Sequence, residues 1–87
     1  MTVTVELFGT LRLRAGTGAC TVEAATVGDA LVALTRAVPA LGGTVIDGHR
    51  LQPAYRLSLN ANRFVSDPAT PLANGDVLLL LAADAGG

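Results

Sequence analysis

Side chains able to do covalent or acid–base chemistry are scarce in this 87-residue chain. His49 is the only histidine and Cys20 the only cysteine, so neither has a second imidazole or thiol with which to share a zinc ion or form a disulfide. His49 lies in the turn-like sequence Gly48-His49-Arg50, and we interpret it as a solvated loop residue. Cys20 lies in a strand-like stretch, and we interpret it as a buried structural thiol.

Two further arrangements of polar residues fall short of a catalytic site. Glu6 and Glu23 are expected on neighbouring strands, where we interpret them as solvated cross-strand partners of arginine or threonine. Gly16-Thr17-Gly18 lacks the spacing and the lysine of a phosphate-binding loop. No serine lies in a nucleophile-elbow sequence. We therefore expect no side chain of this protein to carry out covalent chemistry.

The chemically distinctive feature is the end of the sequence, residues 82–87, which reads AADAGG. A terminal carboxylate can attack the α-phosphate of ATP when another protein supplies the site, and the resulting acyl-adenylate is an activated acyl group. Gly86 and Gly87 have no side chains to clash in a narrow pocket, and six extended residues reach roughly 20 Å. On these residues alone, an active arm and a frayed end remain two open interpretations.

Composition predicts one small domain with enough apolar material for a core. Hydrophobic residues make up 51% of the chain, the net charge is -1, and all six basic residues are arginines. Without a basic run, and with only three aromatic residues, nucleic-acid binding is not expected. The longest apolar run, residues 77–83, is far shorter than the roughly 20 residues that span a bilayer, and no signal-peptide pattern is present. We expect a cytoplasmic protein with no membrane partner.

Strands are predicted wherever apolar and polar residues alternate, at residues 2–8, 19–25, 54–60 and 63–65. The first two are expected to form an antiparallel hairpin, joined by a long connection over residues 9–18. Residues 40–53 are expected to form a loop, and 60–62 a tight turn. A last strand, residues 77–81, is apolar on both faces, so it is expected at the centre of the sheet, parallel to the first strand.

One helix is predicted between Thr26 and Pro39. Thr26 suits the N-cap position, and Asp29 places an acid at the positive end of the helix dipole. Pro39 is expected to end the helix because it lacks an N–H donor. The apolar positions recur at helical spacing: Val27, Ala30, Leu31, Leu34 and Val38.

These elements predict an α+β fold of the β-grasp, ubiquitin-like type, with a mixed sheet and one main helix packed on one face. The domain is expected to span residues 1–81, followed by a C-terminal tail over residues 82–87. If Leu78 and Leu80 face the helix, the opposite face carries a predicted partner interface with an apolar centre and an arginine at its edge. Its residues are Phe8, Arg56, Val77, Leu79 and Leu81. Two alternatives remain: the loop over residues 40–53 covers this face, or Leu78 and Leu80 lie on the surface instead.

The sequence resembles the ubiquitin-like sulfur carrier family over essentially its whole length. ELFGTLRLRAG (6–16) is similar to the family's first strand and following turn, and LNANRFVSDPATPLANGDVLLLL (59–81) to its Asn-containing strand end, PL-x-x-GD turn and last strand. Gly86-Gly87 matches the family's terminus. The family includes the small subunit of molybdopterin synthase, which the chain length favours, and the sulfur carrier of thiamine biosynthesis. Where many members have a stiff residue near the end, this chain has residues 82–85, AADA.

The resemblance implies that a ubiquitin-activating-like adenylyltransferase uses ATP to adenylate the Gly87 carboxylate, which then becomes a thiocarboxylate. Asp84, Ala85 and Gly86 would thread into partner proteins, and no cofactor would be bound by this chain. The sulfur acceptor would be the large subunit of molybdopterin synthase, with this chain as the small subunit and not an enzyme alone. Alternatives are a carrier for cysteine or thiamine biosynthesis, a ubiquitin-like modifier of lysines, and a plain interaction domain.

Overall fold

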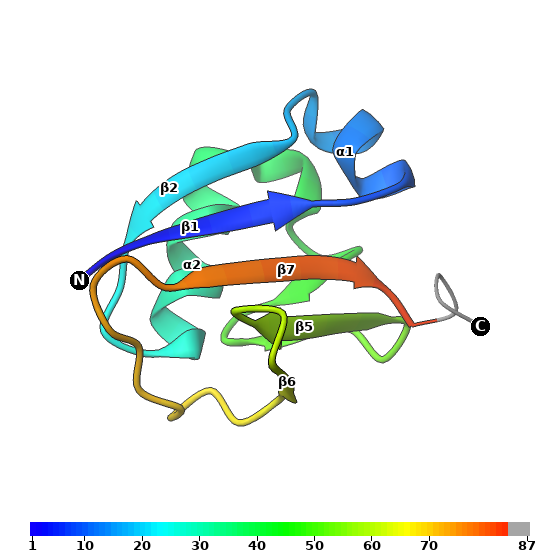
Figure 1. Ribbon diagram of the computed structural model, residues 1–87. Helices are drawn as coiled ribbons and strands as arrows, with labels where there is room; N and C mark the ends of the chain where they lie inside the picture. Colours follow the sequence, from blue (N-terminus) through cyan, green and yellow to red (C-terminus); the bar gives the residue numbers. More distant parts are fainter. Residues whose placement is uncertain (84–87) are drawn as a thin grey trace.

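Two antiparallel hairpins bracket one long helix in the computed structural model, which describes residues 1–83 (Figure 1). The helices are α1 (Thr10–Ala15), α2 (Val27–Ala37) and the short 3-10 helix η1 (Pro39–Leu41). The strands are β1 (Thr2–Leu7), β2 (Ala19–Glu23), β3 (Ile46–Asp47), β4 (Arg50–Leu51), β5 (Tyr55–Leu59), β6 (Arg63–Val65) and β7 (Val77–Ala82).

The main sheet is mixed, with the strand order β2-β1-β7-β5-β6. β1 and β7 are parallel, whereas the β1–β2, β5–β7 and β5–β6 pairs are antiparallel. In Figure 1, α2 lies behind the sheet and the opposite face of the sheet is turned toward the viewer. The predicted β-grasp fold, with its last strand central and parallel to the first, is therefore confirmed.

Helix α2 begins and ends where its sequence predicts. The backbone N–H of Asp29 donates to the Thr26 side-chain oxygen at 3.2 Å, which satisfies one of the free donors of the first turn. The helix ends at Ala37, and Pro39 opens η1. All five apolar positions of the predicted stripe are buried against the sheet: Val27, Ala30, Leu31, Leu34 and Val38.

The connection between β1 and β2 is not the irregular loop that its glycines and arginines suggest. It contains α1, which lies between Gly9 (φ 60°) and Gly16 (φ 74°), two backbone conformations that favour glycine. The reason for the helix is Leu11, which is buried in the core. One amphipathic turn closes the end of the core and leaves its arginines in solvent.

The segment over residues 40–53 is also more ordered than predicted. It contains the end of η1 and the short β3–β4 hairpin, in which Ile46 pairs with Leu51. Leu41, Val45 and Ile46 are buried and belong to the same apolar cluster as α2. The segment therefore lies on the helix side of the sheet, and the alternative that it covers the opposite face is wrong.

The turn that leads into β7 is joined to the end of β5 by the side chains of Asn60 and Asp76. Asn60 Nδ2 donates to Asp76 Oδ1 at 3.0 Å, and the Val77 N–H donates to Asn60 Oδ1 at 2.8 Å. The Ala73 N–H donates to Asp76 Oδ2 at 2.8 Å. These hydrogen bonds, first from Ala73 and then from Asn60, favour the charged carboxylate and lower the pKa of Asp76.

The same turn is joined to β1 on its other side. The Thr2 N–H donates to Asn74 Oδ1 at 2.8 Å, and the Gly75 N–H donates to the Thr2 carbonyl at 2.8 Å. Gly75 has a φ of 88°, where a side chain would strain the backbone. The PL-x-x-GD segment therefore has a structural role, because it fixes the start of β7 between β1 and β5.

Replacing Asp76 with asparagine should destabilise the domain in a pH-dependent way. Because the folded pKa of Asp76 is lowered, its contribution to stability is present above the usual value of 3.8 and is lost as the pH falls through the folded value. Urea unfolding at neutral pH should show a lower midpoint for Asp76→Asn than for the wild type, and the gap should narrow in acid. Asp47→Asn, at the exposed end of β3, is the control. Equal midpoints for Asp76→Asn and wild type at every pH would contradict the role of Asp76.

Two neighbouring leucines of β7 should respond very differently to truncation. Leu80 is fully buried, so Leu80→Ala should lower the free energy of unfolding by about 2–5 kcal/mol. Leu79 is half-buried on the opposite face, so Leu79→Ala should cost about 1 kcal/mol or less. Urea denaturation of the two variants measures both values. A larger loss for Leu79→Ala than for Leu80→Ala would mean that the faces of β7 are assigned the wrong way round.

Candidate partner interface

The candidate site is the face of the sheet that α2 does not cover, which we call the open face. Side chains of β7 alternate strictly between the two faces: Leu78 and Leu80 are fully buried, whereas Val77, Leu79 and Leu81 are half-buried. Of the two orientations that the sequence left open, the structure has the one in which Leu78 and Leu80 face the helix. An apolar stripe of three residues runs along the centre of the open face.

Strand pairing places charged and polar groups on both sides of this stripe. Leu79 is level with Glu6 of β1 on one side and with Ser58 of β5 on the other. Leu81 is level with Arg56 of β5. The stripe therefore has a carboxylate on its β1 side and a guanidinium on its β5 side. Opposite charges at the two borders would orient a partner with complementary charges.

Phe8 extends the apolar stripe beyond the end of β1. Its N–H donates to the Leu80 carbonyl at 3.2 Å, so the residue continues the pairing with β7. The side chain remains 44% exposed, which is unusual for a large aromatic residue. The structure thus brings the residues of the predicted interface to one face: Phe8, Arg56, Val77, Leu79 and Leu81.

Two exposed hydrophobic residues, Phe64 and Leu13, were not among the predicted interface residues. Phe64 is 66% exposed and is level with Ser58 in the β5–β6 pair, which places it on the open face. Leu13 is 82% exposed on α1, a helix that contacts β7. Phe64 could have been found from the alternation within residues 63–65, given the register of the hairpin. Leu13 could not, because α1 itself was not predicted.

The chain leaves the sheet next to the interface. Ala82 pairs with Tyr55, and the Ala83 N–H donates to the Ala54 carbonyl at 2.7 Å. β7 is therefore held against β5 until just beyond Leu81 and Arg56. The residues predicted to react or to thread into partners lie outside the described residues: Asp84, Ala85, Gly86 and Gly87.

The burial of Cys20 differs from its prediction as a buried thiol, whereas the other reactive side chains lie where their sequence contexts suggest. His49 is exposed in the β3–β4 turn, while Cys20 is only half-buried at the edge of the core. Glu23 accepts from the Thr2 hydroxyl at 2.6 Å and lies 3.6 Å from the N-terminal amine, so its partners are not arginines. Glu6 is level with Ala19, so the two glutamates do not form a pair.

Within residues 1–83, no three His, Cys, Asp or Glu side chains are grouped so that they could hold a metal ion. None of the helices in this range is long and apolar enough to cross a membrane.

Comparison with known proteins places this arrangement in a family. No protein-family model and no curated protein matches the sequence. Solved structures do: the chain is similar to SAMP1 from Haloferax volcanii, with a TM-score of 0.83 and 32% identity over 100% of both chains. It is also similar to CysO in the BexX/CysO complex of Amycolatopsis orientalis, with a TM-score of 0.81 and 22% identity over 98% of this chain and 99% of that one.

A third similar structure is the complex of subunits 1 and 2 of the molybdopterin-converting factor from Helicobacter pylori, with a TM-score of 0.67 and 24% identity over 100% of both chains. At these lower identities, the second and third structures show the shared fold. The Haloferax protein matches the full length at a higher identity, with the same mixed sheet and single main helix. The chain therefore belongs to the family of ubiquitin-like sulfur carriers.

Proposed function

We propose that this protein carries sulfur as a thiocarboxylate on its C-terminal Gly87 and delivers it to an acceptor enzyme. The observation that carries the proposal is the double role of β7. Its half-buried residues form the centre of the open face, and the same strand continues directly into the tail. A partner that covers Leu79 and Leu81 is therefore positioned to receive the residues that follow.

The chemistry requires two partners in turn. A ubiquitin-activating-like adenylyltransferase binds ATP, and the Gly87 carboxylate oxygen attacks the α-phosphate, so that an acyl-adenylate forms and pyrophosphate leaves. A sulfur nucleophile then attacks the acyl carbon and AMP leaves. When the nucleophile is a persulfide, a thiol must reduce the resulting acyl disulfide to release the thiocarboxylate. The chain itself supplies the acyl group and the docking surface.

As acceptor we propose the large subunit of molybdopterin synthase, with this chain as the small subunit. Support comes from the PL-x-x-GD turn together with the terminal Gly-Gly, and from the fold shared with the Helicobacter pylori complex of two molybdopterin-converting subunits. Carriers for cysteine or thiamine biosynthesis would use the same first steps. The neighbouring genes distinguish these pathways, since a large synthase subunit beside this gene would favour the molybdopterin pathway.

A second candidate function is protein modification. It is favoured by the identity of 32% to SAMP1 of Haloferax volcanii, a protein whose name in full is small archaeal modifier protein 1. A lysine amine of a target would attack the same acyl-adenylate and form an isopeptide bond. The chain contains no lysine of its own, so it could not be extended into chains through its side chains.

Incubation with the cognate activating enzyme, ATP and a sulfur donor should convert the protein to its thiocarboxylate. Intact mass spectrometry should then show a species heavier by the difference between sulfur and oxygen. A chain lacking Gly86 and Gly87 is the control and should show no such species. If the full chain also shows none, sulfur transfer through Gly87 is excluded. Higher-mass adducts in host lysates that disappear with the deletion would instead support the modifier function.

Leu79→Arg should slow adenylation without unfolding the protein. Leu79 is half-exposed at the centre of the open face, so an arginine can point into solvent when the protein is free but places a charge in an apolar contact when it is bound. We expect kcat/KM for pyrophosphate release, the product of the adenylation step, to fall at least about tenfold. Ala37→Arg, at the exposed end of α2 on the other side of the sheet, is the control. Equal rates for both variants would show that the open face does not contact the activating enzyme.

A further inference from the structure

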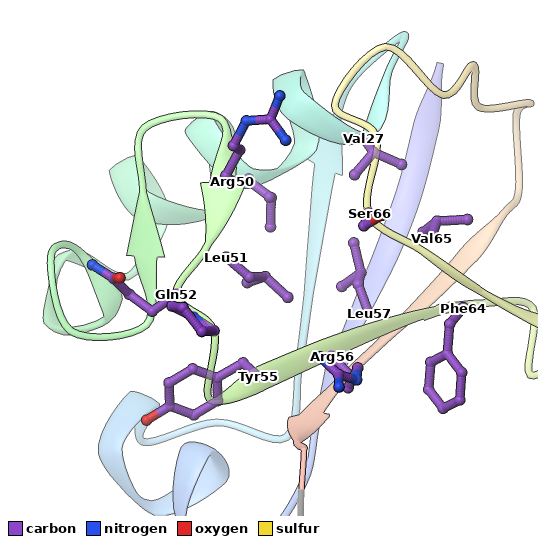
Figure 2. Close-up of a pocket in the computed structure, with 12 residues that line it drawn as sticks. Val27, Arg50, Leu51, Gln52, Tyr55, Arg56, Leu57, Phe64, Val65 and Ser66 are labelled. Carbon is purple, nitrogen blue, oxygen red and sulfur yellow. The ribbon is translucent and has the colours of Figure 1, made fainter.

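A groove of about 340 Å³ lies at the edge of the sheet, beside the open face (Figure 2). The N-terminal half of α2, the β3–β4 hairpin and the β5–β6 hairpin form its walls. Its lining residues come from four elements and two connections: Val27, Leu31, Arg50, Leu51, Gln52, Pro53, Tyr55, Arg56, Leu57, Phe64, Val65 and Ser66.

The floor of the groove is apolar and fixed in position. Val27 and Leu31 of α2, Leu57 of β5 and Val65 of β6 are buried, and all four belong to the central core. Leu51 packs against the same core and remains half-exposed toward the groove. A ligand side chain that entered here would contact mainly Leu51, which the buried aliphatic groups beneath it hold in place, as in the anchor pockets of protein interfaces.

Among residues 1–83, the charged side chains that line the groove are both positive. They are Arg50 and Arg56, which are exposed and lie at separate places around it, as Figure 2 shows. Within residues 1–83 neither guanidinium forms an ion pair or a side-chain hydrogen bond. Two arginines with no ionic partner among residues 1–83, placed around an apolar floor, favour a ligand with carboxylates.

The groove and the open face are parts of one surface. Arg56 is level with Leu81 on the open face and also lines the groove. Phe64 is level with Ser58 on the open face and lines the groove as well. Moreover, β6 pairs only with Leu57–Leu59, so no strand covers that edge of β5 at Arg56. A partner that covers the open face would therefore reach the groove around the edge of β5, where Arg56 and Phe64 belong to both surfaces.

We propose that this groove binds an extended acidic segment of the partner protein that covers the open face, with one apolar side chain on the floor and a carboxylate toward each arginine. This proposal rests on the proposed function, because it gives that partner a second contact. In an extended chain, alternate residues point to the same side, so an acidic-x-aliphatic-x-acidic sequence presents all three groups over about 13 Å. Each arginine would form a charge-assisted hydrogen bond with one carboxylate.

The test titrates the peptide acetyl-Ser-Asp-Thr-Ile-Thr-Asp-Ser-amide into the isotope-labelled full chain and follows backbone NMR signals. The largest shifts should occur at Leu51, Arg56 and Val65. Arg50→Gln and Arg56→Gln should each weaken binding by about three- to tenfold, since each removes one ion pair at a partly exposed site. Arg36→Gln, at the far end of α2, is the matched control and should leave binding unchanged.

The proposal fails if millimolar peptide produces no shifts, or if the largest shifts lie on the open face alone. It also fails if a peptide with lysines in place of both aspartates binds equally well. Stronger binding after deletion of residues 84–87 would identify the chain's own tail as the occupant, and shifts that depend on protein concentration without peptide would identify a second copy. A chain lacking Gly86 and Gly87 cannot be adenylated but should still bind the peptide, so this proposal and the proposed function can fail separately.

Discussion

The structure depends on the insertion of β7 between β1 and β5. β7 pairs with β1 in parallel, so the first and last strands of the sheet lie side by side. Because parallel neighbours need a crossover connection, the chain between them must return from one end of the sheet to the other. α2 lies within that crossover and packs on one face only. As a result Leu78 and Leu80 become the centre of the core, whereas Leu79 and Leu81 stay at the surface. A single strand thus supplies both the stability of the domain and its candidate docking face.

Sequence patterns predicted the elements whose form depends on nearby residues, such as the alternating strands and the capped helix. Alternation predicted β1 and β5, and the Thr26 cap with Pro39 predicted the limits of α2. The central position of β7 followed from its lack of a polar face. The residues of the open face could then be named from strand parity, because one residue assigned to the core fixes the direction of all others on the strand.

Tertiary contacts decided what the sequence patterns missed. α1 forms because Leu11 fills the end of the core, although the glycines and arginines around it suggest an irregular connection. The β3–β4 hairpin is likewise held by Val45 and Ile46, which are buried in the central core. The groove could not be predicted, because its walls come from segments whose proximity depends on the β5–β6 register and on how residues 40–53 fold back.

The arrangement of β7 also determines how the domain responds to tension. A partner that grips the tail pulls along the axis of β7, whose hydrogen bonds to β1 and β5 run across that axis on both sides. The pull loads these bonds together in shear, instead of opening them one at a time. At the other end of the strand, the Asn60, Asp76 and Gly75 contacts hold its start to both neighbours. If a partner draws on the residues after β7, as proposed above, this arrangement resists unfolding of the domain.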